Sequence, residues 1–158
     1  MRMAGAAVQI IAFTLVGIGL LSGCTGNDPT EGDPRQVVIS FFGAMEKNDQ
    51  ATLAHLLDLP ELMKNIDQDY AFQSDKPRIF RNPKDVLDDL TDSGLTKQRW
   101  FSYQRIVNEA QVSTEAATVE VTFVDKQASK GYRTYFGLHK AFGKWKIYSF
   151  KTVEEPKQ

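Results

Sequence analysis

Residues 117–123, Ala-Thr-Val-Glu-Val-Thr-Phe, alternate between apolar and polar side chains. A period of two is typical of a strand that buries one face. The same alternation returns over residues 132–139 and 145–150, and we expect a further strand over Arg99–Glu109. The connections between these segments are short, which favours an antiparallel four-stranded meander.

Helical patterns precede the strands. Asp33-Pro34 supplies a capping residue followed by a proline at the first helical position, and apolar residues then recur at helical spacing. Asp49 is expected to cap a leucine-rich second helix that ends before Pro60, a third helix is expected over Glu61–Tyr70, and Asn82 caps a short fourth one. Helices followed by a meander predict the α+β class, with N-terminal helices packed on a curved, cone-like antiparallel sheet.

Two segments resemble a known superfamily. Pro34–Leu57 holds a helix, a polar break and a leucine-rich helix, and Phe136–Ile147 reads Phe-Gly-Leu-His-Lys, a glycine turn and Lys-Trp-Lys-Ile. This pattern resembles the nuclear transport factor two-like superfamily, a cone of three helices in a curved sheet, and it looks most like the small bacterial lipoproteins of unknown function within it. The resemblance covers Pro34–Thr152 and departs from the usual pattern in the extra segment Gln73–Gly94. It implies an interior pocket, which isomerase-like and dehydratase-like members equip with an ionisable residue.

The N-terminal stretch has the features of a secretory signal. A basic start is followed by an almost uninterrupted apolar run, Ala4–Leu21, and then by Leu21-Ser22-Gly23-Cys24. These four residues resemble the lipobox of bacterial lipoproteins, which implies that Leu21, Ser22 and Gly23 are recognised by the signal peptidase and that Cys24 carries diacylglycerol and fatty acyl chains. Plain secretion and a retained membrane span are the alternatives, although the run is shorter than the ~20 apolar residues of a typical span.

The predicted domain organisation follows from this signal. We expect a signal peptide over residues 1–23, a lipidated cysteine with a flexible tether over 24–33, one α+β domain over 34–153 and a polar tail over 154–158. The only cysteine of the chain is used for lipid, so the domain has no disulfide. The formal net charge of −1 predicts no nucleic-acid partner.

A catalytic constellation is not evident from the sequence. The strand positions expected to face inward carry no Asp, Glu or His; they are Ala117, Val119, Val121, Phe123, Phe136, Leu138, Trp145 and Ile147. Glu120 and His139 fall on the opposite face, and His55 and Asp58 share one helical face at i,i+3 spacing. No metal-ligand spacing and no phosphate-binding loop occurs, so we predict no cofactor and no metal.

The outward strand positions suggest an interface instead. Tyr135, Tyr148 and Phe150 share this face with the basic residues Arg133 and Lys146, a pattern that suits a partner surface unless the Gln73–Gly94 segment covers it. A weak homodimer through this face is the simplest partner, and a small apolar ligand in the cone is another.

These features predict a lipid-anchored cell-envelope binding or scaffolding module more readily than an enzyme. Two alternatives stay open, a small-molecule isomerase or dehydratase that uses the cone pocket and an accessory subunit of an envelope assembly complex. In a Gram-negative cell we expect the outer membrane, facing the periplasm, because Thr25 rather than Asp follows Cys24.

Overall fold

The computed structural model describes residues 28–69, 80–125 and 130–154. The predicted signal peptide, the lipobox and residues 155–158 of the predicted polar tail lie outside these residues. Glu154, which was expected in the tail, is instead the last residue of the fourth strand. In chain order, the elements are η1 Pro29–Glu31, α1 Pro34–Lys47, α2 Gln50–Leu56, α3 Leu59–Asp69, α4 Pro83–Asp89, α5 Leu95–Ser102, β1 Gln104–Val112, β2 Ala116–Asp125, β3 Lys130–Ala141 and β4 Lys144–Glu154.

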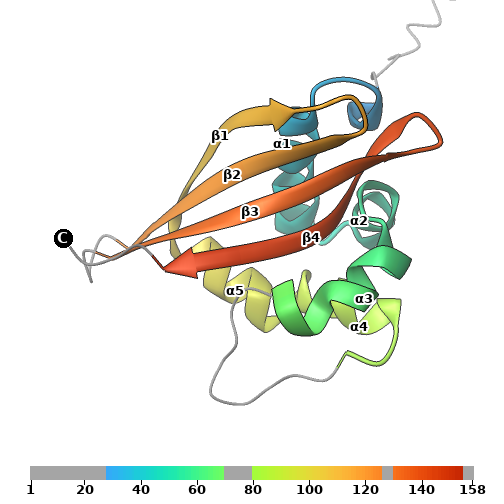
Figure 1. The fold of residues 1–158 in the computed structure, drawn as a ribbon. Coiled ribbons are helices and arrows are strands. Elements are labelled where there is room, and N and C mark those ends of the chain that lie inside the picture. Colours follow the sequence, from blue (N-terminus) through green and yellow to red (C-terminus); the bar gives the residue numbers. More distant parts are fainter. Residues whose placement is uncertain (1–27, 70–79, 126–129, 155–158) are drawn as a thin grey trace, which may run out of the picture.

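The four strands form one antiparallel sheet in the order β1-β2-β3-β4. The predicted meander and the α+β class are therefore confirmed. Figure 1 shows α1 crossing one face of the sheet, with the remaining helices gathered at one side and one end of it. In the part of the chain that the structure describes, the other face of the sheet carries no helix.

The helix starts follow local capping chemistry. The Asp33 side chain accepts a hydrogen bond from the Arg35 backbone N–H at 2.9 Å, and Asn48 ends α1 in the left-handed region at φ 57°. The Asp49 side chain then accepts from the Thr52 N–H at 2.9 Å and so caps α2. The Asn82 side chain caps α4, as expected.

Two boundaries differ from the expectation. Pro60 lies in the first turn of α3 instead of between two helices, because the Asp58 side chain caps that helix through the Glu61 N–H at 3.2 Å. Residues 99–102, expected in the first strand, belong to α5, which buries Thr96 and Trp100 one helical turn apart. The strand begins only at Gln104.

The expected tether from residue 24 to residue 33 is wrong from Asp28 onward. Pro29–Glu31 forms a short 3-10 helix, and Thr30 within it is fully buried. The Asp28 side chain bonds to Thr30 and to Lys144 at the start of β4, so this segment is part of the folded domain. The domain begins about six residues earlier than the proline-led helix suggests.

The space between the sheet and the helices is filled by aromatic rings. Neighbouring ring centroids lie 5.0–6.2 Å apart, mostly edge to face; the rings are those of Phe41, Phe42, Trp100, Phe123, Phe136 and Phe150. Edge-to-face pairs are a favoured aromatic geometry and add to the free energy gained by burial. Every inward strand position predicted from the alternation is buried, including Trp145.

Among residues 28–69, 80–125 and 130–154, no helix is both long and apolar enough to cross a membrane.

Candidate functional site on the outer face of the sheet

A β-bulge in β4 decides which side chains reach the outer face, which is the sheet face opposite α1. In the register of β3 with β4, Leu138 pairs with Ile147 and Gly137 pairs with Ser149, so Tyr148 is the extra residue. A bulge of this kind reverses the alternation of the strand beyond it. Phe150 consequently points to the same side as Ile147.

Phe150 was therefore wrongly predicted to belong to a partner surface. Its side chain is fully buried, and its ring lies 5.0 Å from that of Phe136 and 5.6 Å from that of Trp100. Tyr135 and Tyr148 are both partly exposed and remain on the outer face. The bulge removes one of the three aromatic residues from the expected patch.

Tyr148 is held over a glycine. A Cβ atom built on Gly137 would lie 3.1 Å from the Cζ atom of Tyr148 and 2.4 Å from the Oγ atom of Ser149. The missing side chain thus lets the Tyr148 ring lie close to the neighbouring strand. The ring also stacks on the imidazole of His139, with centroids 4.9 Å apart and an interplanar angle of 27°.

His139 is in turn bonded to Asp58. Its Nε2 atom lies 2.8 Å from Oδ2 of Asp58, and both side chains are partly exposed. Leu57 forms a parallel bridge with Ile147, and the Asp58 N–H donates to the Ile147 carbonyl at 2.8 Å, so the segment before α3 runs along the edge of β4. The Asp58 carboxylate orients the imidazole of His139 through this hydrogen bond, an arrangement that suits polar recognition or proton transfer.

Tyr135 lies at the centre of a row across the sheet. Its partner on β4 is Lys151, and its partner on β2 is Glu120. Asn108 donates to Glu120 Oε1 and to Thr122 Oγ1, each at 3.1 Å. The row therefore presents a cation, an aromatic ring and a fixed carboxylate side by side.

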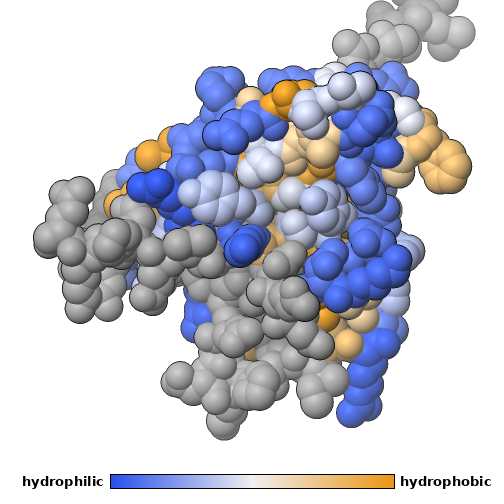
Figure 2. Space-filling view, in the orientation of Figure 1, coloured by the Kyte–Doolittle hydropathy of each residue, from blue (hydrophilic) through white to orange (hydrophobic). Residues whose placement is uncertain are grey.

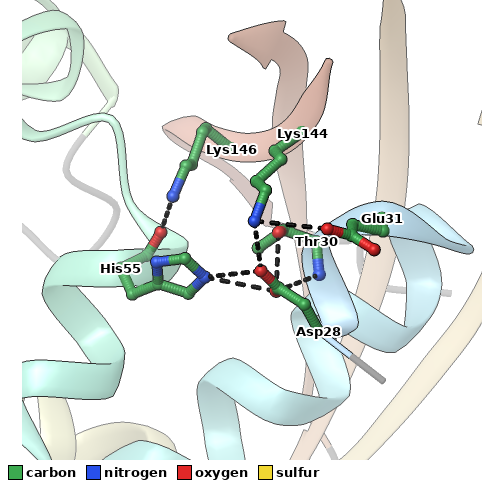
Figure 3. Close-up of polar contacts among 6 residues, drawn as sticks. All are labelled: Asp28, Thr30, Glu31, His55, Lys144 and Lys146. Atoms are coloured by element: carbon green, nitrogen blue, oxygen red, sulfur yellow. Dashed lines mark hydrogen bonds and ion pairs between the residues drawn. The ribbon is translucent and has the colours of Figure 1, made fainter. Parts of the chain in front are cut away.

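A second polar cluster ties the N-terminal segment to the sheet (Figure 3). Asp28 accepts hydrogen bonds from Lys144 at 2.7 Å and from Thr30, and its Oδ2 atom lies 3.1 Å from Nε2 of His55. The hydrogen bond from Lys144 holds the pKa of Asp28 far below its usual range, and the same contact raises the pKa of Lys144. Lys146 donates a hydrogen bond to the backbone carbonyl of His55, and burial lowers the pKa of Lys146. The role of this cluster is to hold the N-terminal segment against the sheet rather than to enclose a cavity.

His55 and Asp58, which share one helical face by their spacing, do not pair with each other in the described structure. His55 contacts Asp28, and Asp58 contacts His139. Helical spacing could identify only local neighbours, whereas both observed pairs join distant segments. No sequence pattern singled out Asp28, because this residue lies in a polar stretch without periodicity.

Arg105 is a half-buried cation at the margin of the aromatic core. Arg105 lies 3.8 Å from the centroid of the Phe101 ring and 5.5 Å from that of Phe42, and it donates to the Trp100 carbonyl at 2.9 Å. Burial lowers the pKa of this guanidinium. No group of three or more potential metal-ligating side chains occurs within the described ranges.

Comparison with known proteins yields distant structural likenesses. No protein-family model matches the chain, and no curated protein matches it. A solved NTF2-like (nuclear transport factor two-like) protein of unknown function from Shewanella baltica is 13% identical, has a TM-score of 0.48, and the match covers 78% of this chain and 92% of that one. An NTF2-like protein from Streptomyces avermitilis, provisionally named a dehydratase, is 16% identical with a TM-score of 0.49 and covers 77% and 93%. An NTF2-like protein of unknown function from Silicibacter pomeroyi is 12% identical with a TM-score of 0.46 and covers 75% and 90%.

The three solved structures are described as NTF2-like, the superfamily that the sequence resembles. At such identities and TM-scores, the likeness says nothing about what the chain binds or converts.

Proposed function

We propose that the protein is a lipid-anchored cell-envelope module of nuclear transport factor two-like type that binds a partner protein through the outer face of its sheet. The observation that carries the proposal is the arrangement of Tyr148 over Gly137, stacked on the Asp58–His139 pair. A partly exposed aromatic ring fixed by a polar network is an anchor of the kind that dominates interface energies.

The packed interior supports binding over catalysis. Six aromatic rings fill the space between the helices and the sheet, which is where the superfamily resemblance implies a substrate pocket. Within the described residues, two carboxylate–imidazole pairs join distant segments by hydrogen bonds, Asp58 with His139 and Asp28 with His55. Both pairs are partly exposed. The enzyme alternative would need an ionisable group with room for substrate beside it.

A second copy of the chain is the partner that the charges favour. Lys151, Tyr135 and Glu120 lie in one row on three adjacent strands. A copy related by a two-fold axis through Tyr135 brings Lys151 of each chain opposite Glu120 of the other, and it stacks the two tyrosine rings. Anchoring both copies in one membrane raises their effective concentration, so a weak contact suffices.

Photocrosslinking in cells tests this function. A benzophenone amino acid in place of Tyr135 in the full chain should yield a covalent dimer, whereas the same group in place of Leu95, an exposed apolar residue on α5, should not. Glu120→Lys should abolish the dimer through repulsion of like charges. The combination of Glu120→Lys with Lys151→Glu restores the opposite charges and should recover it.

Three results would speak against a second copy of the chain as the partner, each in a different way. A dimer of equal yield from both positions would indicate random collision. Failure of the charge exchange to restore crosslinking would refute the two-fold arrangement. An adduct with a different protein at position 135 would mean that the partner is another subunit, as in an envelope assembly complex, and not a second copy of the chain.

A further inference from the structure

The turn between β3 and β4 exposes a phenylalanine. Phe142 is exposed over its whole side chain, at 105% of the reference area, and its backbone has a φ of 53°. Gly143 follows with a φ of 77°, so both turn residues occupy the left-handed region. Asn, Asp or Gly is preferred at such a position, and a bulky residue there is an outlier. Within the described residues, no contact of the Phe142 ring offsets this strain and exposure. This points to a role outside the domain.

The turn has the composition of a membrane-interface element. Residues 140–144 read Lys-Ala-Phe-Gly-Lys, with the aromatic ring at the tip and a lysine at each flank. Lys140 is exposed, and its Nζ atom lies 5.1 Å from the centroid of the Trp145 ring. Figure 2 shows an apolar protrusion at the end of this hairpin, beside a mostly hydrophilic surface. Aromatic tips enter the headgroup region of a bilayer, and neighbouring lysines bind anionic headgroups.

The N-terminal segment emerges beside this turn. Lys144, the residue after Gly143, bonds to Asp28 at 2.7 Å and to Glu31 at 3.3 Å, so the first described residues lie next to the hairpin (Figures 1 and 3). Cys24 precedes Asp28 by four residues. Four residues span at most about 14 Å when fully extended. A lipid on Cys24 therefore keeps this end of the domain at the membrane surface.

We infer that the β3–β4 turn docks on the bilayer that holds the lipid anchor, with the Phe142 ring inserted among the headgroups and Lys140 bound to anionic phospholipid. This inference rests on the proposed function, because it requires the lipid on Cys24. Docking at two points restricts the domain to rotation about the line that joins them. The outer sheet face then samples a narrower range of angles to the surface, which favours contact with a neighbouring copy.

A polarity-sensitive thiol label tests the docking. The mature full-length protein is placed in vesicles of phosphatidylethanolamine and phosphatidylglycerol, and the fluorophore is attached to Phe142→Cys or, as the control, to Leu95→Cys on α5. Cys24 is the only native cysteine, so lipidated wild-type protein takes up no label. We expect the emission of the label at position 142 to shift to the blue and to be quenched by lipid-borne quenchers, while the label at position 95 reports water.

The outcomes separate the docking from the anchor. If wild-type protein takes up label at Cys24, the anchor is absent and both inferences fail. If wild-type protein takes up no label but the label at position 142 shows the emission expected in water, the lipid anchor is present and the docking is refuted. A blue shift that rises with protein density at constant lipid would mean that the turn contacts a second copy, which also refutes the docking.

A second variant does not depend on the label. Phe142→Asn in the lipidated protein should speed transfer between vesicles by about tenfold, because the buried area of one phenylalanine ring is lost. Leu95→Asn should leave the transfer rate unchanged. Equal rates for wild type and Phe142→Asn would overturn the inference.

Discussion

Asp58 and His139 lie 2.8 Å apart across 81 residues of sequence, and this contact joins the start of α3 to the outer face of β3. Asp58 divides its two carboxylate oxygens between His139 and the cap of α3. One residue therefore stabilises a helix start and positions the imidazole under Tyr148.

A double-mutant cycle measures this contact. We expect Asp58→Ala to lower the free energy of unfolding more than His139→Ala, because it removes the helix cap as well, at about 0.5–2 kcal/mol. The coupling energy between the two substitutions should be about 0.5–1.5 kcal/mol. Chemical denaturation of the four proteins gives both values. A coupling of zero would show that the hydrogen bond does not contribute in solution.

The Asp28–Lys144 contact predicts a pH dependence of stability. The pKa of Asp28 is depressed in the folded state, chiefly by the hydrogen bond from Lys144. The stabilisation is therefore complete above the unfolded-state pKa of about 3.9 and declines as the pH falls below it. Asp28→Asn should lower the melting temperature at neutral pH by a few degrees at most, because Lys144 is 37% exposed.

The same variant should show less acid sensitivity than wild type. The difference in melting temperature between Asp28→Asn and wild type should shrink as the pH falls from 5 toward 2. Glu46→Gln, which replaces an exposed acid on α1, serves as the control and should track wild type. A difference that stays constant with pH would mean that the charge of Asp28 is not the source of the effect.

Phe142 offers a test with an unusual sign. Phe142→Asn should raise the free energy of unfolding by about 1 kcal/mol, because asparagine tolerates the left-handed backbone of this turn. Denaturant unfolding in the absence of lipid measures the change. A loss of stability would show that the Phe142 ring packs on the protein and would also weaken the membrane-docking inference.

Much of the fold could be predicted from local patterns. The alternation at 117–123 identified the buried face of β2, and the capping residues Asp33 and Asn82 marked helix starts, since both signals depend on neighbours in the sequence. The inward position of Trp145 follows from the same parity.

The site was less predictable, for three physical reasons. A bulge at Tyr148 reverses the parity of β4, and no sequence period reports an inserted residue, so Phe150 was placed on the wrong face. The pairing of Asp58 with His139 depends on the bridge between Leu57 and Ile147, which is a long-range contact. The packing of Asp28 depends on Lys144, which lies 116 residues away.

The central claim is that Cys24 holds a folded binding module at a membrane, and the intact mass of the mature protein tests it most directly. Purified from membranes, the wild-type chain should begin at Cys24 and carry the added mass of diacylglycerol and a fatty acyl chain. Cys24→Ser should remain an unlipidated precursor with its signal sequence attached, because serine cannot form the thioether. A wild-type protein of unmodified mass, or a Cys24→Ser variant with the same mature N-terminus and the same detergent partitioning as wild type, would contradict the claim.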